Sequence, residues 1–310
     1  MREKISLKGQ RVIVTGSGRG LGRAHALLLG SLGARVVVND LERSAADDVV
    51  AEINGAGGEA IASYDAVGTQ AAGQAIVEVA MANFGGLDAL VNNAGNVRPA
   101  LFPDMTCDDF ESVLQVHLLG SIYTTQAAWP IFQKQQYGRV VMTGSSSGMF
   151  SHPGMANYSA AKAGIFGLAK ALAYEGLDYG IGVNTIMPVG LTDITQGRPI
   201  PTMAENYAKF VGPDLRQKIN DIARSGPEMV AHMVAYLVSR DCEFTGETYS
   251  ALRGRYARVF VGVADGWLTR KGDDVSVETI ADHMPQIRDI SQHSVPKWAF
   301  EETRDFAERL

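Results

Sequence analysis

The chain has 310 residues, 46% of them hydrophobic, and a formal net charge of −6. This much apolar material supports a large buried core and excludes a disordered chain. The negative charge argues against a dedicated nucleic-acid binder, which usually shows a basic balance. The two cysteines lie far apart and the six histidines are scattered, so we expect neither a disulfide framework nor a bound metal.

The apolar runs of the chain bear on its location. The first residues contain no apolar core of signal-peptide length. No apolar run approaches the roughly 18 residues of a membrane span. We therefore expect a cytoplasmic protein without a membrane partner.

Short runs of β-branched residues alternate with helical stretches over the first part of the chain. Strands are predicted at 11–15, 34–39, 61–64, 87–92, 139–143 and 182–187. Helices are predicted at 20–33, 42–54, 69–84, 107–135 and 156–178, the fourth of them broken or ended near Pro130. Continuous apolar strands separated by helices indicate a parallel sheet covered on both faces. We therefore predict an α/β fold with a doubly wound sheet, which binds its ligand beyond the carboxyl ends of the strands.

The later part of the chain is less regular. Residues 190–225 are rich in proline and polar residues and show no period, which is typical of a functional lid or a disordered segment. Beyond them a helix is predicted at 226–240, strand-like sequence at 248–266 and a short helix at 275–287.

A glycine-rich turn, T-G-S-G-R-G-L-G, occupies residues 15–22 between the first predicted strand and helix. Glycines let the backbone approach a pyrophosphate, and the helix N-terminus presents free N–H groups to it. A plain glycine-rich turn is the alternative, but the strand–turn–helix context favours a dinucleotide site. The candidate cofactor residues here are Gly16, Ser17, Arg19, Gly20, Leu21 and Gly22.

The second predicted strand is followed by Asp40, about 20 residues after the glycine turn. A carboxylate here can accept both ribose hydroxyls of NAD and would repel the 2′-phosphate of NADP. Asp is also common as a helix N-cap, and the cation of Arg19 could meet a 2′-phosphate. We weigh Asp40 more heavily and predict that the cofactor is NAD.

Two further turns follow predicted strands. Asp65 and Ala66 after the third strand could touch the adenine, although a plain loop is an equal alternative. The N-N-A-G run at residues 92–95 would let the backbone approach the cofactor, and alone it would be an ordinary turn signal. Its candidate cofactor residues are Asn93, Ala94 and Gly95.

The catalytic signal is Ser145 followed by Tyr158 and Lys162. The tyrosine and the lysine are four residues apart on a predicted helix, so they share a face. A lysine ammonium beside a phenol favours the phenolate, so we expect it to lower the pKa of Tyr158 from its usual ~10. Tyr158 would then serve as general base for alcohol oxidation or as acid for ketone reduction. Ser145, after the fifth strand, can hold the substrate oxygen.

Taken together, these motifs resemble the short-chain dehydrogenase/reductase family. Its T-G-x-x-x-G-x-G is matched at residues 15–22, its N-N-A-G at residues 92–95, and its Ser with Y-x-x-x-K by Ser145, Tyr158 and Lys162. The resemblance implies a single Rossmann-type domain, hydride transfer without metal, contacts of Tyr158 and Lys162 with the cofactor, and a homodimer or homotetramer. We expect residues 1–265 to form the dinucleotide-binding and catalytic domain, with a substrate loop at about 190–225. Residues 266–310 would form an extension that packs on this domain or on a partner subunit.

A closer resemblance is to the (3R)-hydroxyacyl-CoA dehydrogenase region of the peroxisomal multifunctional enzyme. The similar stretches are residues 36–41, 116–121, 127–129, 137–139, 156–162 and 184–188. This resemblance implies a small-molecule substrate, a 3-hydroxyacyl-CoA thioester. The loop at residues 189–195 departs from the usual pattern, so either Thr192 or Thr195 could hold the nicotinamide carboxamide, and Thr195 is the candidate.

His117 stands where the main branch of the family has an Asn, which is thought to support a water that relays protons to the lysine. A neutral imidazole has one donor and one acceptor and can replace part of that hydrogen bonding. We therefore expect His117 to join the relay that ends at Lys162 and Tyr158. The alternative is a buried histidine that only fixes the helix through a backbone hydrogen bond.

Three functions fit the sequence. The first is NAD-dependent oxidation of a hydroxyacyl-CoA, or the reverse reduction. The second is a dehydrogenase or reductase of free steroids, polyols or small ketones. The third is a catalytically silent NAD-binding regulator, and the intact set of Ser145, Tyr158 and Lys162 argues against it.

Overall fold

The computed structural model describes residues 5–150, 152–189, 218, 226–269 and 275–308. The chain divides into two compact units, Met1–Arg258 and Val259–Leu310. Thr192, Thr195 and most of the expected substrate loop lie outside the described residues. No helix among the described residues is long and apolar enough to cross a membrane.

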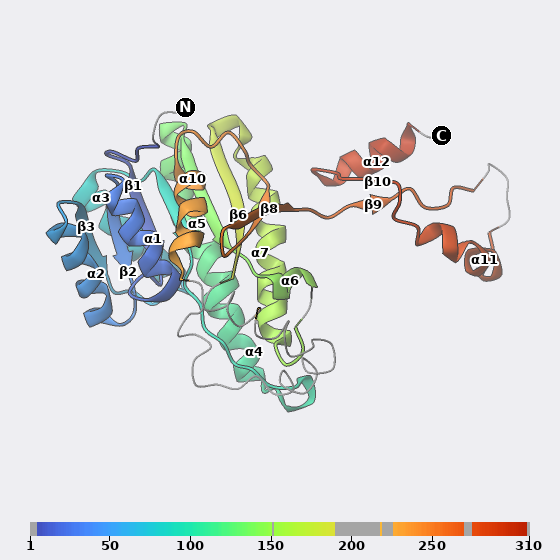
Figure 1. Ribbon diagram of the computed structural model, residues 1–310, viewed down its shortest axis with the longest axis horizontal. Helices are drawn as coiled ribbons and strands as arrows, with labels where there is room; N and C mark the ends of the chain where they lie inside the picture. Colours follow the sequence, from blue (N-terminus) through green and yellow to red (C-terminus); the bar gives the residue numbers. More distant parts are fainter. Residues whose placement is uncertain (1–4, 151, 190–217, 219–225, 270–274, 309–310) are drawn as a thin grey trace. The chain divides into compact units, whose positions relative to one another are not determined.

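An eight-stranded sheet forms the centre of the first unit (Figure 1). Its order is β3-β2-β1-β4-β5-β6-β7-β8, and the strands from β1 to β7 pair in parallel. The order reverses at the β1–β4 pair, which confirms the predicted doubly wound sheet and places a ligand crevice there. The strands are β1 (Arg11–Thr15), β2 (Arg35–Asn39), β3 (Glu59–Ser63), β4 (Ala89–Asn92), β5 (Gly138–Thr143), β6 (Ile181–Val189), β7 (Thr248–Leu252) and β8 (Arg255–Val259).

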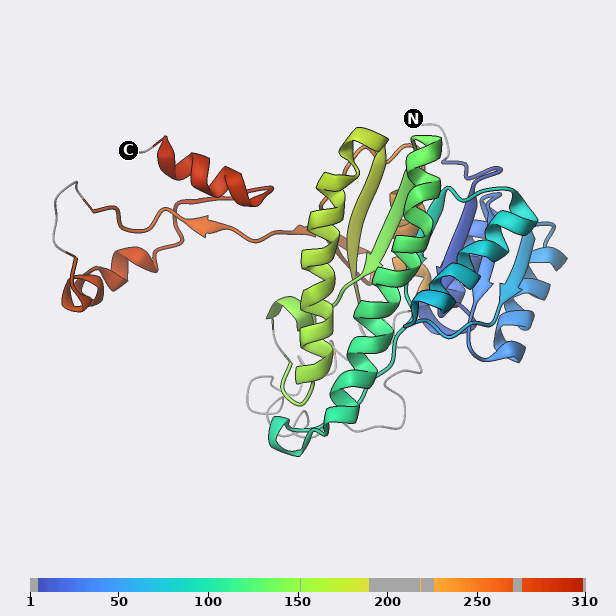
Figure 2. The ribbon, with the colours of Figure 1, turned by 180° about the vertical axis from the view of Figure 1, so that it is seen from behind.

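Helices cover both faces of the sheet because side chains of a strand alternate between its faces. Val12 and Val14 of β1 join one core cluster with Leu29, whereas Ile13 between them joins the other cluster with Phe132. The first cluster lies under α1 (Gly20–Ser31), α2 (Arg43–Gly55) and α10 (Glu228–Val238). The second lies under α3 (Gln70–Phe84), α5 (Gly120–Gln135) and α7 (Ala156–Glu175). Figure 2 shows α5 and α7, in green and yellow-green, across this second face.

The long helix predicted at 107–135 has an irregular segment, but not at the expected place near Pro130. It begins as α4 (Cys107–Leu114), passes through a π-helical segment at Gln115–Leu119 and continues as α5. The break expected near Pro130 is wrong, because α5 runs on to Gln135. Pro130 and Gln126, whose carbonyl loses its helical partner to the proline, are both exposed, so water can satisfy that carbonyl.

The described part of the first unit also contains short helices. They are 3₁₀ turns at Phe102–Asp104 and Leu177–Tyr179 and the helix α6 (Ser146–Phe150). The second unit contains α11 (Val277–Ile287), α12 (Ala299–Ala307) and an antiparallel pair of β9 (Val263–Ala264) and β10 (His293–Ser294). Within it Trp267 stacks on His283, with ring centroids 3.9 Å apart.

Candidate active site

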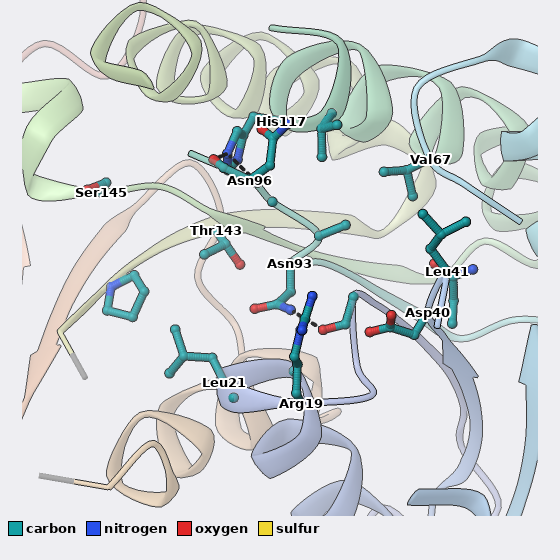
Figure 3. A pocket seen from close by; sticks show the side chains of 18 of the residues that line it. Arg19, Leu21, Asp40, Leu41, Val67, Asn93, Asn96, His117, Thr143 and Ser145 are labelled. Atoms are coloured by element: carbon teal, nitrogen blue, oxygen red, sulfur yellow. Dashed lines mark hydrogen bonds between the residues drawn. The ribbon is translucent and has the colours of Figure 1, made fainter. Parts of the chain in front are cut away.

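A cleft of about 480 Å³ lies beyond the carboxyl ends of the central strands, with Asp40 toward one end and Ser145 toward the other (Figure 3). The structure brings together in it nearly every site residue that the sequence predicts. The predicted residues that line it are Gly16, Arg19, Gly20, Leu21, Gly22, Asp40, Asp65, Ala66, Asn93, Ala94, Gly95, His117, Ser145, Tyr158 and Lys162.

Among the predicted site residues that the structure describes, Ser17 is the one that does not line the cleft. It is fully buried, and its hydroxyl donates to the Val14 carbonyl at 2.7 Å. Its backbone N–H donates to the Asn39 carbonyl at 2.8 Å. Ser17 therefore holds the turn to β2 and does not line the cleft.

The glycine turn is shaped for a ligand that approaches the backbone closely. Gly16 has φ +61°, and a Cβ there would lie 2.7 Å from Ala94 Cα. A Cβ on Gly22 would collide with the Gly16 carbonyl oxygen and come within 2.5 Å of the Asn93 amide. Space therefore requires glycine at both positions, and the positive φ requires it at Gly16 as well.

The N-terminus of α1 follows this turn and faces the cleft. Its N-cap residue, Arg19, makes no side-chain capping hydrogen bond, and the first turn contains no acidic residue. The first N–H groups of the helix are thus left for an anion, and the helix dipole favours a negative charge there. These residues fit the pyrophosphate of a dinucleotide.

Asp40 is held in place at the far end of the cleft. Its Oδ2 accepts the Gly18 N–H at 2.9 Å, and its Oδ1 accepts the Glu42 N–H at 3.1 Å. Asn39, which we did not predict as a site residue, also lines the cleft and donates to the Asp65 carbonyl at 3.0 Å. Its position at a strand end was the only available signal.

A hydrogen-bonded lock joins the loops after β1 and β4. The Thr15 hydroxyl accepts the N–H groups of Asn93 and Ala94, each at 3.0 Å. In return the Asn93 amide donates to the carbonyls of Thr15 and Gly16 at 2.9 and 3.0 Å. The N-N-A-G run is predicted only to let the backbone approach the cofactor. Its Asn93 side chain also holds the glycine turn in place.

The candidate catalytic side chains meet at the other end. Tyr158 and Lys162 lie on the same face of α7, and the Lys162 Nζ is 5.5 Å from the centroid of the Tyr158 ring. Lys162 is buried, and its Nζ donates to the Thr143 carbonyl at 2.5 Å. Ser145, directly after β5 and Gly144, lies close enough to the Tyr158 phenol to lower its pKa.

Burial dominates the protonation of this pair. It raises the pKa of Tyr158 above its usual value, and the nearby Ser145 hydroxyl offsets that rise only in part. Burial also lowers the pKa of Lys162 to about 7. The expected fall in the pKa of Tyr158 is therefore wrong for this arrangement. Removing the phenolate from water destabilises it more than the neighbouring groups stabilise it.

His117 lies in the π-helical segment, beneath the loop after β4. Its ring packs edge-on against Tyr158, with centroids 5.0 Å apart and planes at 89°. Its Nε2 is 2.7 Å from the Asn96 carbonyl oxygen, and burial together with the Lys162 charge keeps its pKa well below 6.5. Among the described residues nothing hydrogen-bonds its buried Nδ1. The backbone bond of the structural alternative is present, whereas the contact with Tyr158 is a ring contact and no hydrogen bond, so the relay role of His117 stays a prediction.

Comparison with known proteins places this site in a family. The family model for short chain dehydrogenase matches residues 10–199. A protein of Mycobacterium tuberculosis, named as a short-chain type dehydrogenase/reductase, is 38% identical over 90% of this chain and 94% of its own length. The chain belongs to the short-chain dehydrogenase/reductase family, whose members are oxidoreductases that use a nicotinamide cofactor.

Larger relatives match as well. The peroxisomal hydratase-dehydrogenase-epimerase of Neurospora crassa is 39% identical over 96% of this chain. The solved full-length peroxisomal multifunctional enzyme type 2 of Drosophila melanogaster has 34% identity and a TM-score of 0.78 over 98% of this chain. The chain spans 32% of the first of these relatives and 50% of the second.

Proposed function

We propose that the protein catalyses NAD-dependent oxidation of a secondary alcohol to a ketone, or the reverse, with Tyr158 as general acid and base. The observation that carries the proposal is the convergence of Ser145, Tyr158 and Lys162 in a cleft that also contains the glycine turn. Asp40 at the far end supports NAD, because its carboxylate can accept ribose hydroxyls and would repel a 2′-phosphate.

Each side chain has a distinct task in this scheme. Gly16, Gly20 and Asp40, which line the cleft, would hold NAD, and the bound nicotinamide would supply the acceptor for the hydride. Ser145 holds the substrate oxygen by a hydrogen bond, and Tyr158 receives the hydroxyl proton or returns it to the ketone. Because burial raises its pKa, Tyr158 rests as a neutral phenol, which is the form required for ketone reduction. Alcohol oxidation begins from the phenolate, which Ser145 and a charged Lys162 stabilise.

The proposed substrate is a 3-hydroxyacyl-CoA thioester. The similarity to the peroxisomal multifunctional enzymes supports this choice. The test is a substrate panel with NAD, followed at the nicotinamide absorbance, in which 3-hydroxyacyl-CoA thioesters compete with free steroids and small alcohols. A higher kcat/KM for a steroid or a small alcohol would overturn the thioester proposal and leave the reaction class intact.

The role of Tyr158 is tested by Tyr158→Phe. This variant keeps the ring and its packing against His117 but lacks the hydroxyl, so kcat should fall by about 10²–10⁴-fold. NAD affinity, measured by fluorescence titration, should change little. Near-normal turnover by the variant would refute the assignment of Tyr158 as acid and base.

A further inference from the structure

The short helix α6 joins the two segments that carry the candidate catalytic residues. It begins directly after Ser145 and packs on α7 with almost no space between the backbones. A Cβ on Gly148 would lie 2.8 Å from Ala163 N and 2.9 Å from Lys162 Cβ. The position of α6 is therefore coupled to the helix that carries Tyr158 and Lys162.

Ser147, on α6, makes two contacts that bear on Ser145. Its backbone N–H donates to Ser145 Oγ at 3.2 Å. Its own hydroxyl is buried and lies 3.2 Å from His152 Nδ1, at hydrogen-bond distance. His152 lies between α6 and α7. The contact therefore joins α6 to the connection that leads into α7.

The contact with the Ser147 N–H restricts the orientation of the Ser145 hydroxyl. A serine oxygen accepts hydrogen bonds through its lone pairs and has one hydrogen to donate. The Ser147 N–H occupies one lone pair of the Ser145 oxygen, and the Ser145 hydrogen remains available to the Tyr158 phenol or the substrate oxygen. Burial lowers the pKa of His152, which favours a neutral ring beside the Ser147 hydroxyl.

We propose that the hydrogen bond between Ser147 and His152 positions Ser145 for hydride transfer, so that both are positioning residues for the reaction. The proposal rests on the proposed function, in which Ser145 holds the substrate oxygen. Neither residue lines the cleft, so their effect has to pass through α6 and Ser145.

Two variants remove the contact in different ways, and two serve as controls. Ser147→Ala removes the hydroxyl and keeps the backbone N–H, and His152→Phe keeps a ring and removes its nitrogens. His152→Asn retains a polar atom near the place of Nδ1. Ser146→Ala removes a hydroxyl from the exposed neighbour on the same helix. All are measured with NAD and the alcohol that the wild type oxidises best in the panel.

Loss of the contact should lower kcat about tenfold to a hundredfold, because a small misplacement of a catalytic group has effects of that size. KM, NAD affinity and the melting temperature should change little. His152→Asn should recover most of the rate, and Ser146→Ala should match the wild type. The variant with both Ser147→Ala and His152→Phe should be no slower than the slower single variant, because the two changes break one bond. In a Ser145→Ala background, Ser147→Ala should have no further effect.

Three results would overturn the proposal. They are wild-type kcat in both Ser147→Ala and His152→Phe, multiplicative losses in the double variant, or a rise in KM alone for His152→Phe, which would indicate direct substrate binding. Turnover that survives Tyr158→Phe would refute the proposed function instead, so the two failures are distinguishable.

Discussion

Lys162 is a buried cation that the structure tolerates at a cost in stability. Burial lowers its pKa from 10.5 to about 7, and its hydrogen bond to the Thr143 carbonyl offsets only part of the desolvation. Lys162→Met should therefore abolish activity and raise the free energy of unfolding by about 1–4 kcal/mol.

The pH dependence of this gain identifies its cause. Below pH about 7 Lys162 is charged in both the folded and the unfolded chain, and the full cost of burial is present. Between pH 7 and 10.5 the unfolded state binds the extra proton, so wild-type stability rises with pH and the advantage of the variant shrinks. Urea unfolding of both proteins at pH 6 and pH 9 measures this. A variant that is less stable than wild type at pH 6 would contradict the argument.

His117 can be tested by two substitutions of different polarity. His117→Asn retains an amide that can bond the Asn96 carbonyl, so it should keep substantial activity. His117→Leu fills the space without a donor, and it should lose most of the activity while remaining folded. The measurements are kcat against pH and thermal melting. A folded Leu variant with wild-type kcat would show that His117 only anchors the loop after β4.

At the scale of elements, we expect the loop after β2 to determine which of NAD and NADP is preferred. Asp40→Asn keeps an oxygen for the Gly18 N–H and removes the charge. It should narrow the preference for NAD over NADP in kcat/KM by roughly tenfold to a hundredfold, because a like-charge contact costs a few kcal/mol. Asp65→Asn, in the same cleft, is the control and should affect the two cofactors alike. A wild type that prefers NADP would overturn the assignment.

The strands and the glycine turn could be predicted because their signals are local. Runs such as residues 11–15 and 35–39 are apolar and β-branched, and β1 to β6 begin and end within two residues of the predicted places. The π-helical segment has no such signal. It is accompanied by contacts from a distant loop, where the Gln115 side chain bonds the Gly68 carbonyl and Val67 packs on Gly120.

The pKa shifts at the site could not be predicted from the sequence, because they depend on burial. The pattern of Ser145, Tyr158 and Lys162 indicated which groups meet, but the direction of a pKa shift depends on how much water remains around them. Asn39 is the last residue of β2 and Ser147 lies in the short helix α6, and apart from the strand-end position of Asn39 nothing in their sequence context distinguishes them from ordinary polar residues.

At the scale of the whole molecule, the second unit leaves large apolar side chains exposed among its described residues. Val277 is 80% exposed, Ile290 76% and Phe300 67%. Exposed apolar groups of this size are typical of surfaces that contact another protein. This supports the expectation of a homodimer or homotetramer, which light scattering of the purified protein can measure.

Among the residues that the structure describes, those that line the cleft lie between Gly16 and Pro188, within the first unit. A chain that ends at Arg258 should therefore bind NAD with an affinity close to that of the full chain. Calorimetric titration of both proteins tests this, with circular dichroism to confirm that the shorter chain is folded. A folded truncated chain that fails to bind NAD would show that Val259–Leu310 contributes to the site.

The lock between Thr15 and Asn93 has a consequence for how fast the cofactor is captured. Four hydrogen bonds hold the loops after β1 and β4 together within the protein chain itself. The floor of the crevice is thus formed before any ligand arrives, and little loop entropy is lost when one binds. Capture should follow the frequency of encounters, with an observed rate that rises in proportion to cofactor concentration and reaches no plateau set by loop rearrangement.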